Sequence, residues 1–294
     1  MPELPEVETL RRELARVLVG QKIASGEILW RGAIKPLSPK QFLQKIIGQK
    51  IKKVERRAKI LLLSLHPSDL TLAIHLKMTG QLIYQPHPLQ LPRRGRERQS
   101  KRPLPFGEGR GGVHTRVIFN FTDRSHLYFN DLRKFGWLKI LSADHRKILI
   151  ARHGLEPLTP EFSLKKFQTI LSRYPNRILK ALLLDQTLIA GLGNIYVDES
   201  CFASRIKPAR KIKTLSKLEI KKLYSAIKRI LKLAITKGGT SARDYVRSDG
   251  SLGNFVPHLK VYGRAKQPCK ICRAPITKIK LAGRGTHFCP RCQK

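Results

Sequence analysis

The sequence lacks long hydrophobic runs and a secretory leader. None of its apolar stretches approaches the roughly 18 residues that a membrane-spanning helix needs, so we expect no membrane association. The first residues carry Glu3, Glu6 and Glu8 in place of a basic and then apolar leader, which argues against a signal peptide. We therefore expect a cytoplasmic protein.

Acidic residues are also scarce. Only 20 Asp and Glu oppose 59 Lys and Arg in the 294 residues, which leaves a formal net charge of +39. A surface this basic repels itself unless anions neutralise it, so the excess favours a nucleic-acid partner. The alternative is a solvated, lysine-rich surface in a proteome of biased composition.

Hydrophobic periodicity indicates a mixed order of elements. An amphipathic helix is predicted over 3–19, because apolar residues recur at three- and four-residue steps and Gly20 follows. Short apolar runs between 22 and 84, and again over 113–141, are typical of strands. Helices are expected near 163–173, 177–188, 194–203 and 215–237, and a flexible Gly- and Ser-rich loop at 238–254.

Residues 86–112 differ abruptly from their surroundings. They hold five prolines, five glycines and seven Arg or Lys, with little apolar content. Such a composition cannot bury enough apolar surface to offset the entropy of ordering the chain. It predicts a flexible basic insertion.

Four of the five cysteines form a metal-binding pattern. Cys269 and Cys272 make one CxxC, and Cys289 and Cys292 make another, with sixteen residues between them. Two such turns converge on a tetrahedral Zn²⁺, and four protein ligands leave no open catalytic position. The spacing therefore predicts one structural zinc, while Cys201 is expected to be a buried small side chain.

The N-terminus, MPELPEVE, carries a second chemical pattern. Methionine before proline is normally removed, which would expose Pro2 as a secondary amine. An α-amino group titrates near ~8, so much of it is neutral and able to attack an electrophilic sugar carbon. Glu3 beside it can transfer protons. The alternative is that both residues only begin a helix.

Six segments together resemble the formamidopyrimidine-DNA glycosylase family, in the family's order and through nearly the whole chain. Only 86–112 interrupts the likeness, as an insertion. The segments are MPELPEVETLRREL, HLKMTG (75–80), DLRKFG (131–136), GLEPL (154–158), LLLDQTLIAGLGNIYVDE (182–199) and VYGRAKQPCKIC…GRGTHFCPRCQK (261–294).

The resemblance implies an α+β fold with DNA bound in a cleft between two lobes. Its expected parts are an N-terminal helix and two-layer β-sandwich over 1–141, a hinge linker at 142–153, a helix-two-turns-helix domain at 154–258 with a lesion-recognition loop at 238–254, and a zinc finger at 259–294. It also implies a monomeric, nucleoid-associated enzyme that acts on damaged double-stranded DNA.

The implied activity is excision of oxidised purines, followed by β- and δ-elimination at the abasic site. Pro2 would be the nucleophile and form a Schiff base, and Glu3 the general acid and base. Glu6 would support the first helical turn and the lesion pocket. Lys59 would aid the first elimination and Arg284 the second. For Lys59, a solvated surface lysine is the alternative.

Other positions match the family's DNA contacts. Met78, Arg133 and Phe135 would fill the space that the flipped nucleotide leaves, although core packing is the alternative for the two apolar residues. Backbone contacts are expected from His114, Lys180, Arg284 and from Asn194 with the amides around Gly193.

The chain departs from the family at three places. Ala58 replaces a common glycine, Asn176 stands where a second basic residue is usual, and 255–257 differ from the usual residues. Two rival functions stay open. One is an endonuclease VIII-like enzyme for oxidised pyrimidines, and the other is a non-catalytic DNA-binding protein that kept the fold.

Overall fold

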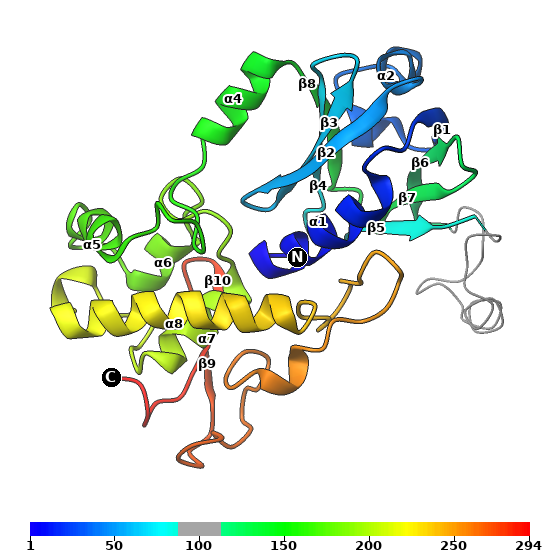
Figure 1. Cartoon of the computed structure of the whole chain (residues 1–294). Coiled ribbons are helices and arrows are strands. Elements are labelled where there is room, and N and C mark those ends of the chain that lie inside the picture. Colours follow the sequence, from blue (N-terminus) through cyan, green and yellow to red (C-terminus); the bar gives the residue numbers. More distant parts are fainter. Residues whose placement is uncertain (88–112) are drawn as a thin grey trace. The chain divides into compact units, whose positions relative to one another are not determined.

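The computed structural model describes residues 1–87 and 113–294, in two compact units (Figure 1). Unit 1 comprises Met1–Pro2, Glu6–Ile150 and Gly238–Asn254, and unit 2 comprises Glu3–Pro5, Ala151–Lys237 and Phe255–Lys294. The predicted insertion at 86–112 lies, apart from its first two residues, outside the described residues. No helix within the described ranges is long and apolar enough to span a membrane.

Unit 1 is built on two antiparallel sheets with strand orders β1-β6-β7-β5 and β2-β3-β4-β8. Their strands are β1 Ile23–Ile28, β2 Lys50–Arg57, β3 Ile60–His66, β4 Thr71–His75, β5 Gly80–Gln85, β6 Thr115–Phe121, β7 His126–Asp131 and β8 Trp137–Leu141. Side chains from both sheets, such as Leu63 and Phe129, join one buried cluster. That shared core confirms the two-layer arrangement expected for the N-terminal part.

Helix α1, Leu4–Leu18, matches the helix predicted over 3–19. Its Leu10, Leu14 and Leu18 are fully buried in the core of the two sheets. Truncating one of them to alanine would cost about 2–5 kcal/mol, because a cavity replaces packed methyl groups. The unit also contains η1, Arg31–Ile34, and α2, Pro39–Ile46.

The segment 142–153, expected as a linker, contains helix α4, Ala143–Ala151. Every residue of α4 is at least partly exposed. The sequence pattern gave little indication of this helix, because its charged and apolar residues do not gather on one buried face.

Unit 2 is mainly helical. Its helices are α5 Leu164–Ser172, α6 Leu179–Leu184, α7 Asn194–Ala203 and α8 Lys217–Thr236, with short turns η3 Ile212–Thr214 and η4 Val256–His258. Their apolar faces form a second buried cluster that includes Phe167, Tyr196 and Leu231. Helix α8 begins with a capping box, in which Ser216 and Glu219 each accept a hydrogen bond from the other's backbone N–H.

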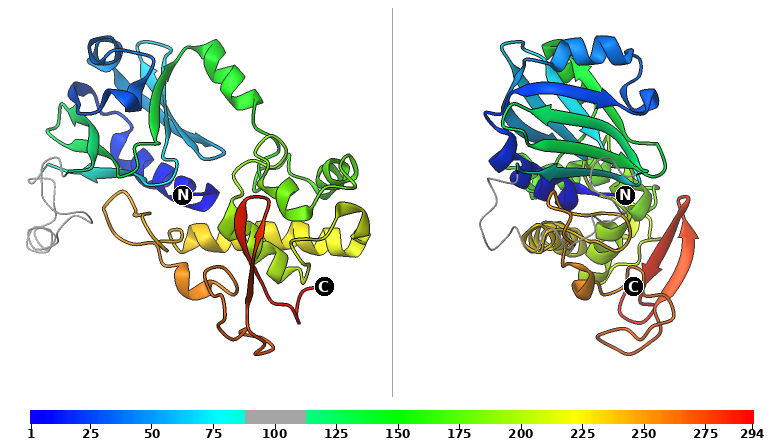
Figure 2. Two further views of the ribbon diagram at one scale, coloured as in Figure 1. Left: turned by 180° about the vertical axis from the view of Figure 1, so that it is seen from behind. Right: turned by 90° about the vertical axis from the view of Figure 1, so that its right-hand side faces the viewer.

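The last element is a hairpin of β9, Thr277–Leu281, and β10, Arg284–Phe288. Figure 2 shows it as a two-stranded ribbon at the red end of the colour bar. Ala282 and Gly283 both have positive φ, as the two central residues of a tight hairpin turn require. Mixed helix and sheet with a terminal four-cysteine hairpin confirms the predicted fold class.

Candidate functional site

Glu3 is bound at the N-terminus of α7. Its side chain is 2 % exposed. The backbone N–H groups of Ile195 and Tyr196 donate to its two carboxylate oxygens at 2.9 and 3.3 Å. Helix N-termini stabilise anions through unpaired amides and the positive end of the helix dipole. Glu3 therefore occupies two amides that follow Gly193, close to the place where a DNA phosphate was expected to bind.

Gly193 makes this arrangement sterically possible. A Cβ atom at this position would lie 2.3 Å from the carboxyl carbon of Glu3. Nearby, the N–H of Leu4 donates to the carbonyl of Gly191 at 3.0 Å, which fixes the residue that follows Glu3. The glycines of the GLGN segment thus serve close approach of the chain's own N-terminus.

In unit 1, Glu6 holds the start of the 238–254 loop. Its buried carboxylate accepts a hydrogen bond from the N–H of Thr240 at 2.8 Å. The Tyr245 hydroxyl donates to the carbonyl of Gly238 at 3.1 Å. Burial raises the pKa of Tyr245 well above its ordinary value, so the phenol stays protonated and able to donate.

The rest of this loop is also held in place. Glu13 accepts hydrogen bonds from Arg247 Nε at 2.6 Å and from both the N–H and the hydroxyl of Ser248 at 3.0 Å. The amide of Gln81 donates to the carbonyl of Asp244 at 2.6 Å. Side chains of α1 and β5 therefore anchor the loop that its Gly and Ser content led us to expect as flexible.

Lys59 lies in the turn between β2 and β3 and is 6 % exposed. This burial argues against a solvated surface lysine. The preceding Ala58 adopts φ +53°, a conformation that favours glycine. Arg56 supports the turn, because its Nη1 donates to the carbonyl of Ala58 at 2.8 Å while its Nε donates to Glu8 at 3.1 Å.

Three arginines surround the carboxylate of Glu8. Burial by itself raises its pKa, but hydrogen bonds from Arg11 and Arg12 and the charge of Arg56 outweigh that effect. The net result lowers the pKa of Glu8 to about 2. Glu8 thus remains ionised and links α1 to the turn that bears Lys59.

The three residues expected to fill the DNA stack lie on two connected loops. Asp131 is fully buried and accepts a hydrogen bond from the Thr79 hydroxyl at 2.5 Å, and Thr79 in turn accepts one from the N–H of Arg133 at 2.9 Å. The N–H of Gly136 donates to the other carboxylate oxygen of Asp131 at 2.6 Å.

These bonds set how far each of the three side chains is exposed. Phe135 is 52 % exposed, which excludes the core-packing alternative for it, and the Arg133 guanidinium lies 4.8 Å from its ring centroid. Met78 is half-buried. His114, also half-buried, is joined to the same region because its carbonyl accepts from the N–H of Asp131 at 2.9 Å.

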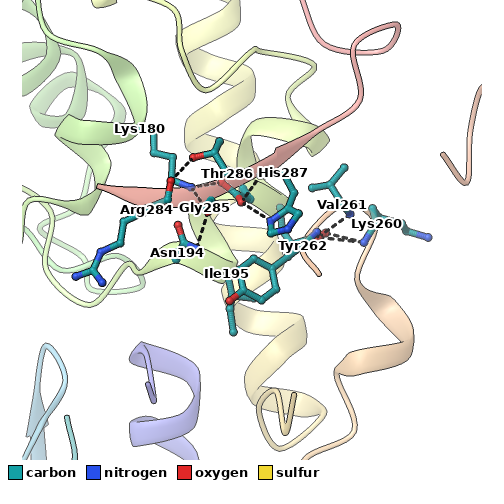
Figure 3. A network of polar contacts seen from close by, with 12 residues as sticks. Lys180, Asn194, Ile195, Lys260, Val261, Tyr262, Arg284, Gly285, Thr286 and His287 are labelled. Atoms are coloured by element: carbon teal, nitrogen blue, oxygen red, sulfur yellow. Dashed lines mark hydrogen bonds and ion pairs between the residues drawn. The ribbon is translucent and has the colours of Figure 1, made fainter. Parts of the chain in front are cut away.

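Arg284 is exposed at the first position of β10, next to the hairpin turn (Figure 3). The backbone of β10 next to Arg284 is held by hydrogen bonds to the carbonyl of Gly285. This oxygen accepts hydrogen bonds from Asn194 Nδ2 at 2.9 Å and from Lys180 Nζ at 3.3 Å. The side chain of Asn194, expected at the DNA backbone, therefore also anchors the hairpin.

The structure corrects the expectation for Lys180. Its side chain is fully buried, and Nζ donates to Asp198 Oδ1 at 2.6 Å. An ammonium group enclosed in this way is not accessible to a phosphate. The match to a DNA-binding position indicated a functional lysine, but the carboxylate that neutralises it lies 18 residues away and left no pattern in the sequence.

The four predicted zinc ligands converge. The Sγ atoms of Cys269, Cys272, Cys289 and Cys292 all lie within 4.8 Å of one another. Zn–S bonds of about 2.3 Å in a tetrahedron require S–S separations of just under ~4 Å, so this cluster fits the ion. The N–H groups of Ile271 and Cys292 point at Cys269 and Cys289 Sγ, each at 3.4 Å, and would stabilise thiolates. Cys201 is buried in α7, as predicted.

Comparison with known proteins agrees with this description. Residues 1–138 match the formamidopyrimidine-DNA glycosylase N-terminal domain, 153–246 match the H2TH domain of the same enzymes, and 266–294 match a zinc finger found in FPG and IleRS. The fold and the cysteine cluster thus define a DNA-repair glycosylase with a zinc finger that holds one structural zinc. The chain belongs to the formamidopyrimidine-DNA glycosylase family.

Individual relatives are similar along their whole length. The formamidopyrimidine-DNA glycosylase of Listeria monocytogenes is 40% identical over 296 residues, with 100% of both chains covered. A Lactococcus lactis FPG mutant in complex with DNA containing Fapy-dG has a TM-score of 0.83 at 38% identity, again over 100% of both chains. The wild-type L. lactis enzyme with DNA containing an oxidised pyrimidine has a TM-score of 0.82 at 37% identity and the same coverage.

Several positioning residues were not predicted. Glu8, Thr79, Asp131 and Asp198 each hold a segment that bears a predicted site residue, and Glu13 holds the predicted lesion-recognition loop. One indication was present: acids are rare in this chain, and Asp131 and Asp198 stand inside segments that carry the family resemblance.

Proposed function

We propose that this chain binds damaged double-stranded DNA, excises oxidised purines and then cleaves the strand at the resulting abasic site. The observation that carries the proposal is the fixed carboxylate of Glu3, directly next to Pro2 in the chain. A secondary amine beside an immobilised proton-transfer group is the minimum equipment for Schiff-base glycosylase chemistry.

The first step begins once Met1 is removed. Pro2 nitrogen then forms a bond to sugar C1′ while the bond from C1′ to the damaged base breaks. A protonated Glu3 gives its proton to the leaving base, takes up the proton that the attacking Pro2 nitrogen loses, and passes it to the ring oxygen as the ring opens, so the opened sugar remains attached to Pro2 as an iminium ion. Met1 itself is 42 % exposed, whereas Pro2 is buried while Met1 is in place.

The two strand-cleavage steps follow from this iminium. Loss of a C2′ proton expels the 3′ phosphate by β-elimination, and loss of the C4′ proton then expels the 5′ phosphate by δ-elimination. We assign assistance in the first elimination to Lys59 and in the second to Arg284. Arg284 is exposed and carries a guanidinium, so it would act by hydrogen bonding and charge on a departing phosphate.

The preferred lesion in this proposal is 8-oxoguanine or a ring-opened purine opposite cytosine. An exposed aromatic wedge (Phe135) and an adjacent guanidinium (Arg133) suit a protein that flips a nucleotide and inspects the base left behind. Guanidinium donors pair well with the acceptor edge of cytosine. Phosphate contacts are assigned to His114, Asn194 and the basic surface, and the enzyme would act as a monomer.

The endonuclease VIII-like alternative remains a competing hypothesis. The complex of the L. lactis relative with DNA containing an oxidised pyrimidine supports testing both lesion classes. Duplexes with 8-oxoguanine:cytosine, 8-oxoguanine:adenine and thymine glycol should therefore be compared side by side. Fastest excision of thymine glycol would overturn the purine assignment.

Borohydride trapping tests the nucleophile. The mature protein, incubated with an 8-oxoguanine duplex and borohydride, should form a covalent adduct that maps to the N-terminal peptide. Glu3→Gln should trap far less, whereas Glu27→Gln, an exposed carboxylate in the other unit, should trap normally. An adduct on Lys59 alone would contradict the role of Pro2. No adduct with any lesion would favour the non-catalytic alternative.

A further inference from the structure

Asp198 lies at the centre of a buried polar network that the proposed chemistry does not use directly. It stands on α7 and is fully buried. Its Oδ1 accepts from Lys180 Nζ at 2.6 Å, and its Oδ2 accepts from the backbone N–H of His287 at 2.8 Å (Figure 3). One carboxylate therefore joins α6 and α7 to strand β10 of the finger hairpin.

The network binds the backbone of β10 on both sides of Thr286, at Gly285 and at His287. Lys180, oriented by Asp198, also donates to the carbonyl of Gly285 at 3.3 Å, and Asn194 donates to the same oxygen at 2.9 Å. Gly285 directly follows Arg284. The backbone is thus fixed at residues 285 and 287, whereas the side chain of Arg284 extends into solvent.

We propose that Asp198 is a positioning residue for Arg284 in the second elimination. This inference rests on the proposed function of Arg284. A guanidinium that contacts a departing phosphate must extend from a backbone of fixed position, because displacement by about 1 Å can lower a rate by roughly a hundredfold. Asp198 fixes the backbone of β10 in two ways: it keeps the Lys180 ammonium in place, and it accepts a hydrogen bond from β10 itself.

The same helix also fixes Glu3, through the first amides of α7. Asn194 and Asp198 are four residues apart and so lie on one face of this helix. Within unit 2, α7 consequently fixes both Glu3, which transfers protons in the first step of the proposed reaction, and the strand that bears Arg284, which acts in the last step.

Glu199 offers a matched control. It is the next residue on α7 and is also buried, and its carboxylate accepts from the N–H groups of Lys260, Val261 and Tyr262 at 2.9 to 3.1 Å. Glu199 therefore anchors residues 260–262, which lead into the finger, and not the backbone of β10 itself. A general loosening of the finger should follow from either substitution, whereas misplacement of Arg284 should follow only from a change at Asp198.

The test measures the ratio of δ- to β-elimination products on an end-labelled abasic-site duplex under single-turnover conditions. Asp198→Asn should lower this ratio by roughly ten- to a hundredfold, with zinc content and borohydride trapping close to wild type. Glu199→Gln should keep the wild-type ratio. Arg284→Ala gives the reference value for complete loss of the Arg284 contribution.

A double variant protects the test against simple unfolding. Asp198→Asn leaves Lys180 as an unpaired buried charge, which is strongly destabilising, but Lys180→Met combined with Asp198→Asn removes both charges. The double variant still lacks the Nζ contact to Gly285, so its product ratio should remain low. Restoration of the wild-type ratio, or equal losses in Asp198→Asn and Glu199→Gln, would overturn the positioning role.

The outcomes also separate this inference from the proposed function. If wild-type protein forms δ product and Asp198→Asn does so equally well, only the positioning role fails. If wild-type protein forms no trapped adduct or only β product, the proposed activity of Arg284 fails, and the inference fails with it.

Discussion

Thr79 and Asp131 share a 2.5 Å hydrogen bond that joins two loops 52 residues apart in the chain. One loop bears Met78 and the other bears Arg133 and Phe135. Because Thr79 also accepts from the N–H of Arg133, its hydroxyl serves both as donor and as acceptor. This hydroxyl therefore helps to set the relative placement of the three side chains proposed to enter DNA, beside the pairing of Gly80 with Asp131 between β5 and β7.

Thr79→Val tests this dependence. The nearly isosteric substitution leaves a buried carboxylate oxygen and an N–H without their partner, which should lower the free energy of unfolding by about 1–3 kcal/mol. It should also reduce the preference for cytosine over adenine opposite the lesion. Urea denaturation and excision assays measure the two effects. Thr122→Val, at an exposed position of the same unit, should change neither, and an unaltered preference in Thr79→Val would refute the link.

Arg133 should carry most of the opposite-base preference. Pairing 8-oxoguanine with adenine is expected to slow excision roughly ten- to a hundredfold, since one mismatched polar contact to a base costs about 1–3 kcal/mol. Arg133→Ala should erase most of that difference and weaken binding. Lys147→Ala on the exposed helix α4 removes the same charge and should preserve the preference. Equal losses in both variants would reduce Arg133 to a non-specific phosphate contact.

Glu8 predicts a defined dependence of stability on pH. Its pKa in the folded protein is about 2, below the ordinary value of 4.5, so folding favours the ionised form. The resulting stabilisation, on the order of 1–3 kcal/mol after allowance for partial solvent screening, is fully present above pH 4.5 and is lost as pH falls through 2.

Denaturation of wild type and Glu8→Gln between pH 2 and pH 7 checks this. The difference in unfolding free energy should be constant near neutrality and shrink between pH 4.5 and pH 2, the two ends of the shift. Glu27→Gln, exposed on β1, provides the comparison. A difference that persists unchanged at pH 2 would mean that Glu8 contributes by packing and not by charge.

Zinc removal should impair DNA binding more than chemistry. Metal analysis should find about one zinc per chain, since the four thiolates form one complete coordination shell. Chelation or Cys289→Ser should weaken DNA affinity sharply, because the β9–β10 hairpin loses the metal site at which its two ends meet. Cys201→Ala, outside the cysteine cluster, should retain the metal and the affinity. Full affinity of metal-free protein would contradict a binding role for the finger.

Much of this architecture could be predicted from the sequence because it is local. The helical period of α1 and the paired CxxC turns each depend on residues close together in the chain. The anchoring carboxylates could not be predicted in the same way. Glu13 binds Ser248 across 235 residues, and no spacing rule connects positions so far apart.

Partners that lie elsewhere in the chain also explain why the structure differs from what we expected for the 238–254 loop and for Lys180. Gly and Ser in 238–254 indicated mobility, but the anchors of that loop are on α1. Lys180 was expected to meet phosphate, but its charge is neutralised by a carboxylate one helix further along. In both cases the composition of the segment gave no indication of the carboxylate elsewhere in the chain that binds it, Glu13 for the loop and Asp198 for Lys180.

The contact between Glu3 and the start of α7 has a consequence for how the protein responds to its ionic surroundings. A helix N-terminus attracts any small anion, yet here the occupant is covalently tethered and so competes at an effective concentration of the order of millimolar or more. Inorganic phosphate or sulfate in a buffer should therefore fail to expel it. Added salt will loosen the grip of the basic surface on DNA, while the acid beside Pro2 keeps its place.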